Sequence, residues 1–203
     1  AARQENAEYG LERLEEVVDT LIVIPNDKLL EIVPDVSLNT AFKIADEILV
    51  NAVKGVTELV TKPGLVNLDF ADIRAVMGEG GIAMIGMGQS DTDSRATEAV
   101  QKALSNPLLD VEIEGGKGAL VNVTGGTGLS LNEAQEVVNT VSGKLSESAK
   151  IIWGAQVRED MDSSLQAMII VTGVDSPQIY GPDNTHQDEY EEEIEQELGV
   201  EFI

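Results

Sequence analysis

The sequence predicts an α/β (α+β) fold in three parts: the end of one α/β domain, a long central helix and a complete α+β domain. Three observations support this prediction. A continuous apolar run at 20–25 is typical of a strand buried in a parallel sheet. A helical pattern of apolar residues then extends from Leu38 to Val60. Beyond it, helix and strand patterns alternate up to residue 174, which favours a four-stranded mixed sheet with helices packed on one face.

Composition limits the kinds of function. The 203 residues suit one domain, or one domain with a piece of another, and with 42% hydrophobic but 3% aromatic residues the core must be aliphatic. The absence of cysteine excludes disulfides and thiolate metal sites. The one histidine, His186, lies in a polar terminal stretch, so histidine-based catalysis is not expected. No apolar run reaches the ~18 residues of a membrane span, so we expect no direct membrane insertion.

The charge is strongly negative. Thirteen Lys and Arg against 37 Asp and Glu give a net charge of −24. This charge argues against nucleic acid or anionic lipid as a direct partner. Self-repulsion of this size is weakened by salt, so we predict a salt-adapted, halophilic source for the chain.

The first part, residues 1–36, has the pattern of a domain end. Residues 3–18 form an amphipathic helical pattern, and the strand at 20–25 follows. Asn26-Asp27 caps a short helical turn. A parallel strand needs neighbours, and none precedes this one. We therefore expect this part to be the remnant of a larger domain, and the chain, which begins with Ala1, to be a fragment.

The central helix is predicted at 37–61. Ser37 is a good N-cap, and Lys62-Pro63-Gly64 is a strong helix stop. The helix would be about 35 Å long, and its broad apolar stripe indicates packing on more than one side. The stripe recurs at threes and fours: Leu38, Ala41, Phe42, Ala45, Ile48, Leu49, Ala52, Val53, Val56, Leu59 and Val60.

The α+β domain is predicted at 62–174, followed by an acidic tail at 175–203. Its helices are expected at 69–77, 91–105 and 131–145, and its strands at 81–88, 116–125, 149–157 and 164–174. The tail carries nine acids from Asp183 to Glu201 and no Lys or Arg, a composition typical of disorder. Its apolar end, LGVEFI, is either a peptide that folds onto a partner or a frayed terminus.

The first candidate for chemistry is the acidic loop with Asn67, Asp69 and Asp72. These oxygens could hold a water or a cation, but spacing alone favours a helix cap, with Asp69 at the N-cap and Asp72 at N3. A carboxylate can also polarise the attacking water in phosphoryl transfer. Because no glycine-rich phosphate loop precedes the helix, such chemistry would require a nucleotide held by another surface.

Two further candidates have ordinary explanations. Thr124–Gly128, TGGTG, lies between a strand and a helix, where a phosphate loop would sit, but its spacing fits neither GxGxxG nor GK[ST]. A tight connection capped by Ser130 or Asn132 explains it better. Phe42 and Asp46 share a helix face, and a ring beside a carboxylate can bind guanine; a core Phe with an exposed Asp is the simpler interpretation.

Several stretches resemble FtsZ, the family of tubulin-like cell-division GTPases. They are VDTLIVIPNDKLL, KPGLVNLDFADIRAVM and GIAMIGMG, and the similarity runs from about residue 7 to 174. The stretch IIWGAQV and the acidic bias favour an archaeal member. The resemblance implies the end of a Rossmann-like GTP-binding domain, a central helix and a C-terminal α+β domain. The glycine-rich signature GGGTGTG is not present in this sequence.

The resemblance also implies roles for individual residues. Phe42 and Asp46 match residues that contact guanine, and Arg3 matches an arginine near the ribose. Asn67, Asp69 and Asp72 match the loop that enters the nucleotide site of the next subunit in a filament and promotes hydrolysis. The catalytic site would then be shared between two chains, and this chain alone would be inactive.

The implied ligands are GTP or GDP, with Mg²⁺ or, as an alternative, K⁺. The implied partners are further copies of the chain in a head-to-tail filament, an N-terminal GTP-binding half, and a membrane anchor of SepF type bound through residues 194–203. The implied place is the cytoplasm at the division ring. The alternative function is a non-catalytic tubulin-like scaffold whose tail recruits division partners.

Overall fold

The computed structural model describes residues 2–24, 38–78, 81–109 and 113–174, which belong to two compact units. One unit contains helix α1 (Ala2–Glu15), and the other, residues 17–175, contains every described strand. The predicted turn at 27–33, the cap Ser37 and the tail at 175–203 lie outside the described residues. Within the described part, no helix is long and apolar enough to cross a membrane.

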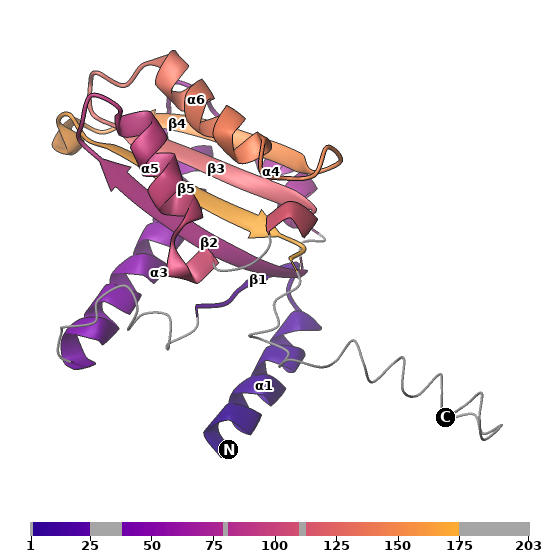
Figure 1. The fold of residues 1–203 in the computed structure, drawn as a ribbon. Coiled ribbons are helices and arrows are strands. Elements are labelled where there is room, and N and C mark those ends of the chain that lie inside the picture. The colour runs from indigo at the N-terminus through magenta and orange to yellow at the C-terminus, as the bar shows by residue number, and fades with distance from the viewer. Residues whose placement is uncertain (1, 25–37, 79–80, 110–112, 175–203) are drawn as a thin grey trace. The chain divides into compact units, whose positions relative to one another are not determined.

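The larger unit is built on a five-stranded mixed sheet in the order β1-β2-β5-β3-β4 (Figure 1). Strand β5 is antiparallel to β2 and β3, whereas the β1–β2 and β3–β4 pairs are parallel. The strands are β1 (Thr20–Ile22), β2 (Gly81–Ser90), β3 (Gly118–Gly125), β4 (Lys150–Val157) and β5 (Leu165–Thr172). The α/β class and the mixed sheet are therefore confirmed.

All five predicted strands are present, but they form one sheet, whereas we had predicted a sheet of four strands. The short strand β1 joins the sheet, with Thr20 opposite Gly81, and Val23 N–H donates to Ala83 O at 3.4 Å. We had assigned this strand to a preceding domain because no earlier strand could pair with it. In the structure its partner is β2, which follows it later in the chain, so it forms the edge of the same sheet.

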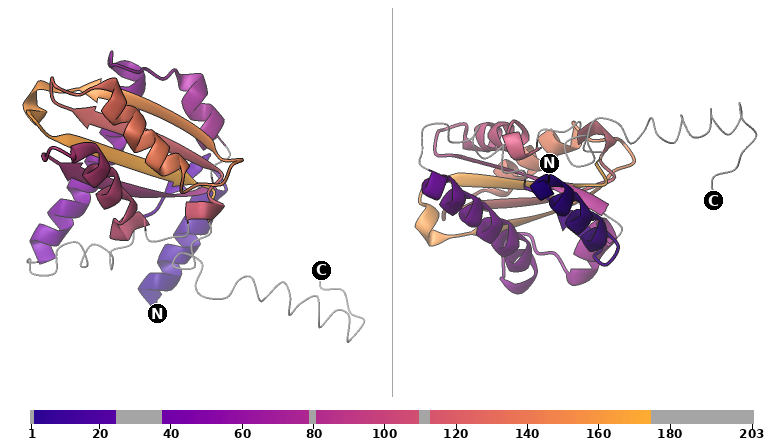
Figure 2. Two further views of the ribbon diagram at one scale, coloured as in Figure 1. Left: turned by 45° about the horizontal axis from the view of Figure 1, so that its top comes forward. Right: turned by 90° about the horizontal axis from the view of Figure 1, so that it is seen from below.

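Helices cover both faces of the sheet, which corrects the prediction of helices on one face (Figure 2). Helices α3 (Leu38–Thr61) and α4 (Phe70–Met77) cover one face, and α5 (Arg95–Leu104) and α6 (Leu131–Ser142) cover the other. Successive residues of β2 show the reason, since they point to opposite faces. Ile85 packs in the core beneath α3 and α4, while a Cβ atom on Gly86 would lie 2.2 Å from Ala103 O of α5.

Helix α3 confirms the predicted central helix but packs on the sheet by one side only. Ile48, Ala52 and Leu59 are buried against the sheet side, whereas Leu49 and Val53 are 48% and 66% exposed. The predicted packing on more than one side is therefore not seen in the larger unit. An exposed apolar side of this kind marks a surface that can bind another part of a protein.

The remaining elements follow the predicted order. Helix α5 begins at Arg95 rather than Asp91, after Ser94 at the N-cap position. Helix α4 begins after the N-cap Asp69, as predicted. In the described connections, short 3₁₀ turns lie at Pro107–Leu109, Ile113–Gly115 and Glu159–Met161.

Candidate functional site

The loop between α3 and α4 is fixed against β4. Leu65 N–H donates to Ala155 O at 2.8 Å, and Val66 forms an antiparallel bridge with the same residue. Gly64 approaches so closely that a Cβ atom there would lie 2.4 Å from Ala155 O. Asn67 Oδ1 accepts a hydrogen bond from Gly64 N–H at 2.7 Å and closes the turn. The acidic side chains that follow therefore start from a fixed backbone path.

Asp69 and Asp72 form a reciprocal capping box at the start of α4. Asp72 N–H donates to Asp69 Oδ1 at 2.8 Å, and Asp69 N–H donates to Asp72 Oδ2 at 3.2 Å. The capping role predicted from spacing is thus present. The box uses one oxygen of each carboxylate and leaves Asp69 Oδ2 and Asp72 Oδ1 outside it. Because both side chains are exposed, the structure holds two oriented carboxylates at the surface.

Exposed apolar side chains lie on the same loop as this acid pair and on the strand to which the loop is bonded. Leu65 is 50% exposed, Phe70 is 68% exposed and Val157 is 41% exposed. They come from neighbouring backbone: Leu65 bonds to Ala155, two residues before Val157, and Phe70 follows Asp69. We call these three residues the apolar rim. Exposed apolar groups around fixed polar groups are typical of a protein interface.

Phe42 and Asp46 lie near the other end of α3. Both are exposed, Phe42 by 51%, and their spacing of four places them on one helical face. The expectation of a core Phe at this position is therefore wrong for the larger unit. From Phe42 to Thr61 the helix rises roughly 28 Å at ~1.5 Å per residue. The acid pair follows the far end of this helix, whereas the Phe42–Asp46 pair lies near its start.

Arg3 belongs to α1, in the other compact unit, and its side chain is outside the described part of the structure. The structure therefore brings Asn67, Asp69 and Asp72 together and keeps Phe42 and Asp46 as a second, distant pair.

The glycine-rich turn after β3 has structural contacts. A Cβ atom on Gly126 would lie 1.6 Å from Asp162 O, so this glycine allows close approach of the β4–β5 connection. Leu129 N–H donates to Gly126 O at 3.0 Å. Ser130 is the N-cap of α6 and forms a capping box with Glu133. The prediction of a tight, capped connection is confirmed, with Ser130 rather than Asn132 as the cap.

Arg95 joins three parts of the larger unit, and the sequence analysis did not find it. Its Nε donates to Glu133 Oε1 at 2.6 Å, and its guanidinium also donates to Gly128 O and Ser163 O. The hydrogen bond from Arg95, helped by those from Ser130, lowers the pKa of Glu133 to about 2. The pair is separated by 38 residues, so no local pattern could have revealed it.

The described residues offer separate candidate groups for a cation and for a base. Among them, no three His, Cys, Asp or Glu side chains come together as a metal site. A hydrated Mg²⁺ held mainly by phosphates needs only one or two carboxylates, which Asp69 and Asp72 can supply. Phe42 and Asp46 suit a base, whereas the turn at 124–128 is occupied by structural contacts.

Comparison with known proteins gives consistent matches. The C-terminal domain of the FtsZ family matches residues 81–175. Cell division protein FtsZ 1 of Archaeoglobus fulgidus is 56% identical over 181 residues, 89% of this chain and 49% of the relative. Cell division protein FtsZ of Haloferax mediterranei is 53% identical over 95% of this chain and 51% of the relative.

The same match appears in three dimensions. A structure described as an empty FtsZ dimer of M. jannaschii superposes with a TM-score of 0.82 at 56% identity, over 84% of this chain and 50% of that one. This chain spans about half the length of the curated relatives it matches. Both the sequence and the fold lead to one conclusion: the chain carries the C-terminal domain of the FtsZ family and is similar to archaeal FtsZ proteins.

Proposed function

We propose that this chain supplies the hydrolysis-activating part of a cell-division GTPase that polymerises head to tail. The observation that carries the proposal is the exposed, fixed pair Asp69 and Asp72 beyond the end of α3, whereas Phe42 and Asp46 lie near its start, with a rise of roughly 28 Å from Phe42 to Thr61. One nucleotide does not span this distance, so each GTP would contact the base-binding end of one chain and the acid pair of the next. A heterologous contact that does not close produces a filament.

In this proposal the chain positions water. Bound GTP supplies the reacting phosphate, and Mg²⁺ or K⁺ balances its charge. The oxygens of Asp69 and Asp72 outside the capping box accept hydrogen bonds from the attacking water and orient it, and Asn67 helps to place the water and the cation. Orientation and electrostatic stabilisation are the main contributions that a protein makes to phosphoryl transfer.

The apolar surfaces suit the partners that the proposal requires. The apolar rim would bind the next copy of the chain, and the relative from M. jannaschii is described as a dimer. The exposed side of α3, with Leu49 and Val53, would bind an N-terminal GTP-binding half.

The proposed domain boundaries divide the chain into four parts. They are a domain remnant at 1–36, the central helix at 37–61, the activating domain at 62–174 and the acidic tail at 175–203.

The tail would connect the filament to the membrane. Residues 194–203 lie outside the described residues, and their acidic and apolar sequence suits a peptide that folds onto a partner. We propose an anchor of SepF type as that partner and the cytoplasmic division ring as the place. A peptide of these residues should bind the anchor, and replacing Phe202 and Ile203 with Ser should abolish that binding.

Substitution of Asp69 by Asn separates catalysis from capping. Asn is as good an N-cap as Asp, so Asp69→Asn keeps the hydrogen bond to Asp72 N–H and removes the charge. In the complete protein, we expect GTP turnover to fall by a factor on the order of 100, as for loss of a general acid–base group. GTP affinity and the melting temperature should remain near the unsubstituted values. Phosphate release and nucleotide binding are the measurements.

Ser130→Ala is the matched control, because it breaks the other capping box, at the start of α6. It should lower stability by about 1 kcal/mol and leave turnover per folded molecule unchanged. Normal turnover in both Asp69→Asn and Asp72→Asn would refute the proposal.

The capping box also favours a second candidate, a non-catalytic scaffold in which both acids serve only the helix. Mixing this chain with a separate N-terminal half distinguishes the two. GTP-dependent light scattering together with phosphate release supports the GTPase. Scattering without phosphate release supports the scaffold.

A further inference from the structure

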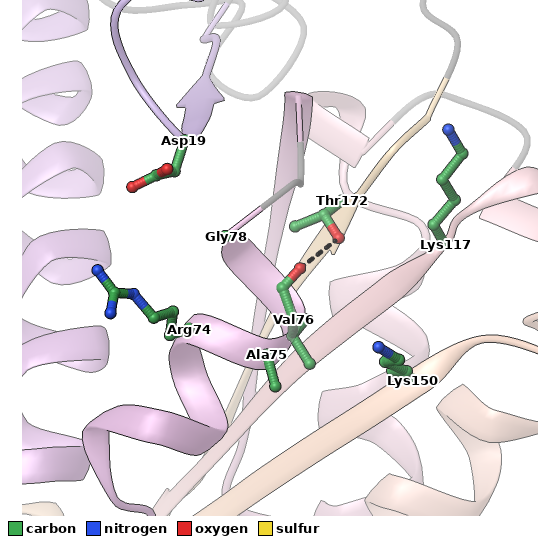
Figure 3. Close-up of a pocket in the computed structure, with 8 residues that line it drawn as sticks. All are labelled: Asp19, Arg74, Ala75, Val76, Gly78, Lys117, Lys150 and Thr172. Carbon is green, nitrogen blue, oxygen red and sulfur yellow. Dashed lines mark hydrogen bonds between the residues drawn. The ribbon is translucent and has the colours of Figure 1, made fainter.

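A hollow of about 470 Å³ lies at the end of the sheet where β3 and β4 begin and β5 ends (Figure 3). Three of its lining residues are basic, Arg74, Lys117 and Lys150, and one is acidic, Asp19. Figure 3 shows Arg74 and Asp19 on one side of the buried Val76 and Thr172, and the two lysines on the other.

The charge of this hollow is opposite to that of the chain. Its four charged residues carry a net charge of +2, in a protein of −24 with only 13 basic residues. Three other cations of the described residues have carboxylate partners: Lys62 pairs with Glu58, Arg95 with Glu133 and Arg158 with Asp160. Among the described residues, the side chains of Arg74, Lys117 and Lys150 form no ion pair. The chain thus concentrates unneutralised positive charge at one place.

The backbone holds the two lysines next to each other. Lys150 N–H donates to Lys117 O at 3.1 Å. A Cβ atom on Gly173 would lie 2.9 Å from the Lys117 stem, so the glycine gives that stem room against β5. Both lysines line the hollow, from the adjacent starts of β3 and β4, so an anion bound in it can approach both of them.

The walls of the hollow are also fixed. The Thr172 hydroxyl donates to Val76 O at 3.3 Å, which ties the end of α4 to β5 (Figure 3). Gly78 N–H donates to Arg74 O at 2.8 Å and closes the last turn of α4. Arg74 therefore extends from a helix end that is bonded to the sheet. The basic side chains start from a rigid frame rather than from a mobile loop.

We propose that this hollow binds a small ligand with two or more oxyanion groups, either phosphates or carboxylates. The Arg74 fork can bind one oxyanion through two nitrogens, and the lysines can bind a second. The volume exceeds the needs of a single phosphate and lies in the range of small-molecule sites. Asp19 opposes the basic residues and weakens the attraction. The site is distinct from the acid pair and does not depend on GTP hydrolysis.

Calorimetric titration of this 203-residue chain at constant ionic strength tests the site, with pyrophosphate, citrate and orthophosphate as probes. We expect one equivalent to bind, and pyrophosphate or citrate to bind more tightly than orthophosphate. If pyrophosphate binds more tightly than citrate, phosphate is the preferred group; if citrate binds more tightly, carboxylate is. Amide resonances of Gly78 and Gly173 should shift during the titration, which locates the ligand independently of the heat.

Charge substitutions of both signs make the test specific. Lys150→Gln and Arg74→Gln should each weaken binding roughly tenfold, the factor for one charge-assisted hydrogen bond, whereas Asp19→Asn should strengthen it. Lys144→Gln is the matched control, because Lys144 is an exposed lysine after α6 and does not line the hollow; it should change nothing. Equal affinity in Lys150→Gln and Lys144→Gln, or weaker binding in Asp19→Asn, would overturn the proposal, as would the absence of resonance shifts.

Discussion

Glu133 is the residue whose ionisation the fold controls through several hydrogen bonds at once. The hydrogen bond from Arg95 is the largest cause of its lowered pKa, and Ser130 adds two more through its backbone N–H and its hydroxyl. One carboxylate therefore completes the cap of α6 and holds Arg95, which in turn donates to the β3–α6 turn and the β4–β5 connection. Loss of its charge should loosen both contacts.

We predict a pH-dependent effect of Glu133→Gln. The folded pKa of about 2 lies below the ordinary value of 4.5, so the stabilisation is complete above pH 4.5 and is lost as the pH falls towards 2. At pH 7 the substitution should lower the free energy of unfolding by about 2 kcal/mol. The difference between the two proteins should shrink between pH 4.5 and pH 2, as measured by urea unfolding.

Asp160→Asn provides the comparison, because its pair with Arg158 is exposed on both sides. Its urea midpoint should follow that of the unsubstituted chain at each pH. A constant difference for Glu133→Gln from pH 7 to pH 2 would contradict the assigned role.

Local residue patterns were predictable, whereas long-range ones were not. The boxes at Asp69–Asp72 and Ser130–Glu133 depend on a spacing of three, which the sequence displays. The bond from Leu65 to Ala155 and the Arg95–Glu133 pair join distant positions. The basic hollow also escaped prediction, because Arg74, Lys117 and Lys150 come from three separate elements. The scarcity of basic residues was the one available signal.

At the scale of elements, the type and order of helices and strands were predictable, but their layering was not. The apolar runs at 81–88 and 167–171 are continuous, and such runs are typical of strands buried on both faces. These runs already favoured helices on both faces of the sheet, although we predicted helices on one face only. Strand β1 was misassigned because a parallel partner can lie beyond a long crossover, and periodicity carries no information about pairing.

Two glycines of β2 set the distance between that strand and α5. Cβ atoms on Gly86 and Gly88 would each lie 2.2 Å from a carbonyl oxygen of α5, Ala103 O and Ala99 O respectively. Gly88→Ala should therefore push the helix away and lower the free energy of unfolding by about 2–3 kcal/mol, as overpacking does. Urea unfolding followed by circular dichroism measures the loss.

Gly143→Ala is the control at this scale. Gly143 ends α6 with φ −68°, and its nearest neighbour would be an ordinary 3.5 Å from the new Cβ atom. Stability should stay the same or rise slightly, since Ala restricts the unfolded chain. An equal loss in both variants would show that close packing of α5 is not the cause.

At the scale of the whole molecule, the balance of charge decides how the chain responds to salt. Relatives from Archaeoglobus fulgidus and Haloferax mediterranei are 56% and 53% identical to it. The two relatives are about equally similar to this chain, so sequence identity gives no support to the prediction of salt adaptation. That prediction depends on the net charge of −24. Repulsion among so many carboxylates opposes the compact state at low ionic strength.

We therefore predict that the melting temperature rises with KCl. The screening length falls from about 10 Å at 0.1 M to about 3 Å at 1 M salt, so most of the repulsion should disappear over this range. Each kcal/mol gained should raise the melting temperature by roughly 2–4 °C for a chain of this size. Sucrose at equal osmolality is the control, because it does not screen charge. Lys117→Gln combined with Lys150→Gln makes the chain more negative and should steepen the dependence on KCl. A chain that melts at its highest temperature without salt would contradict salt adaptation.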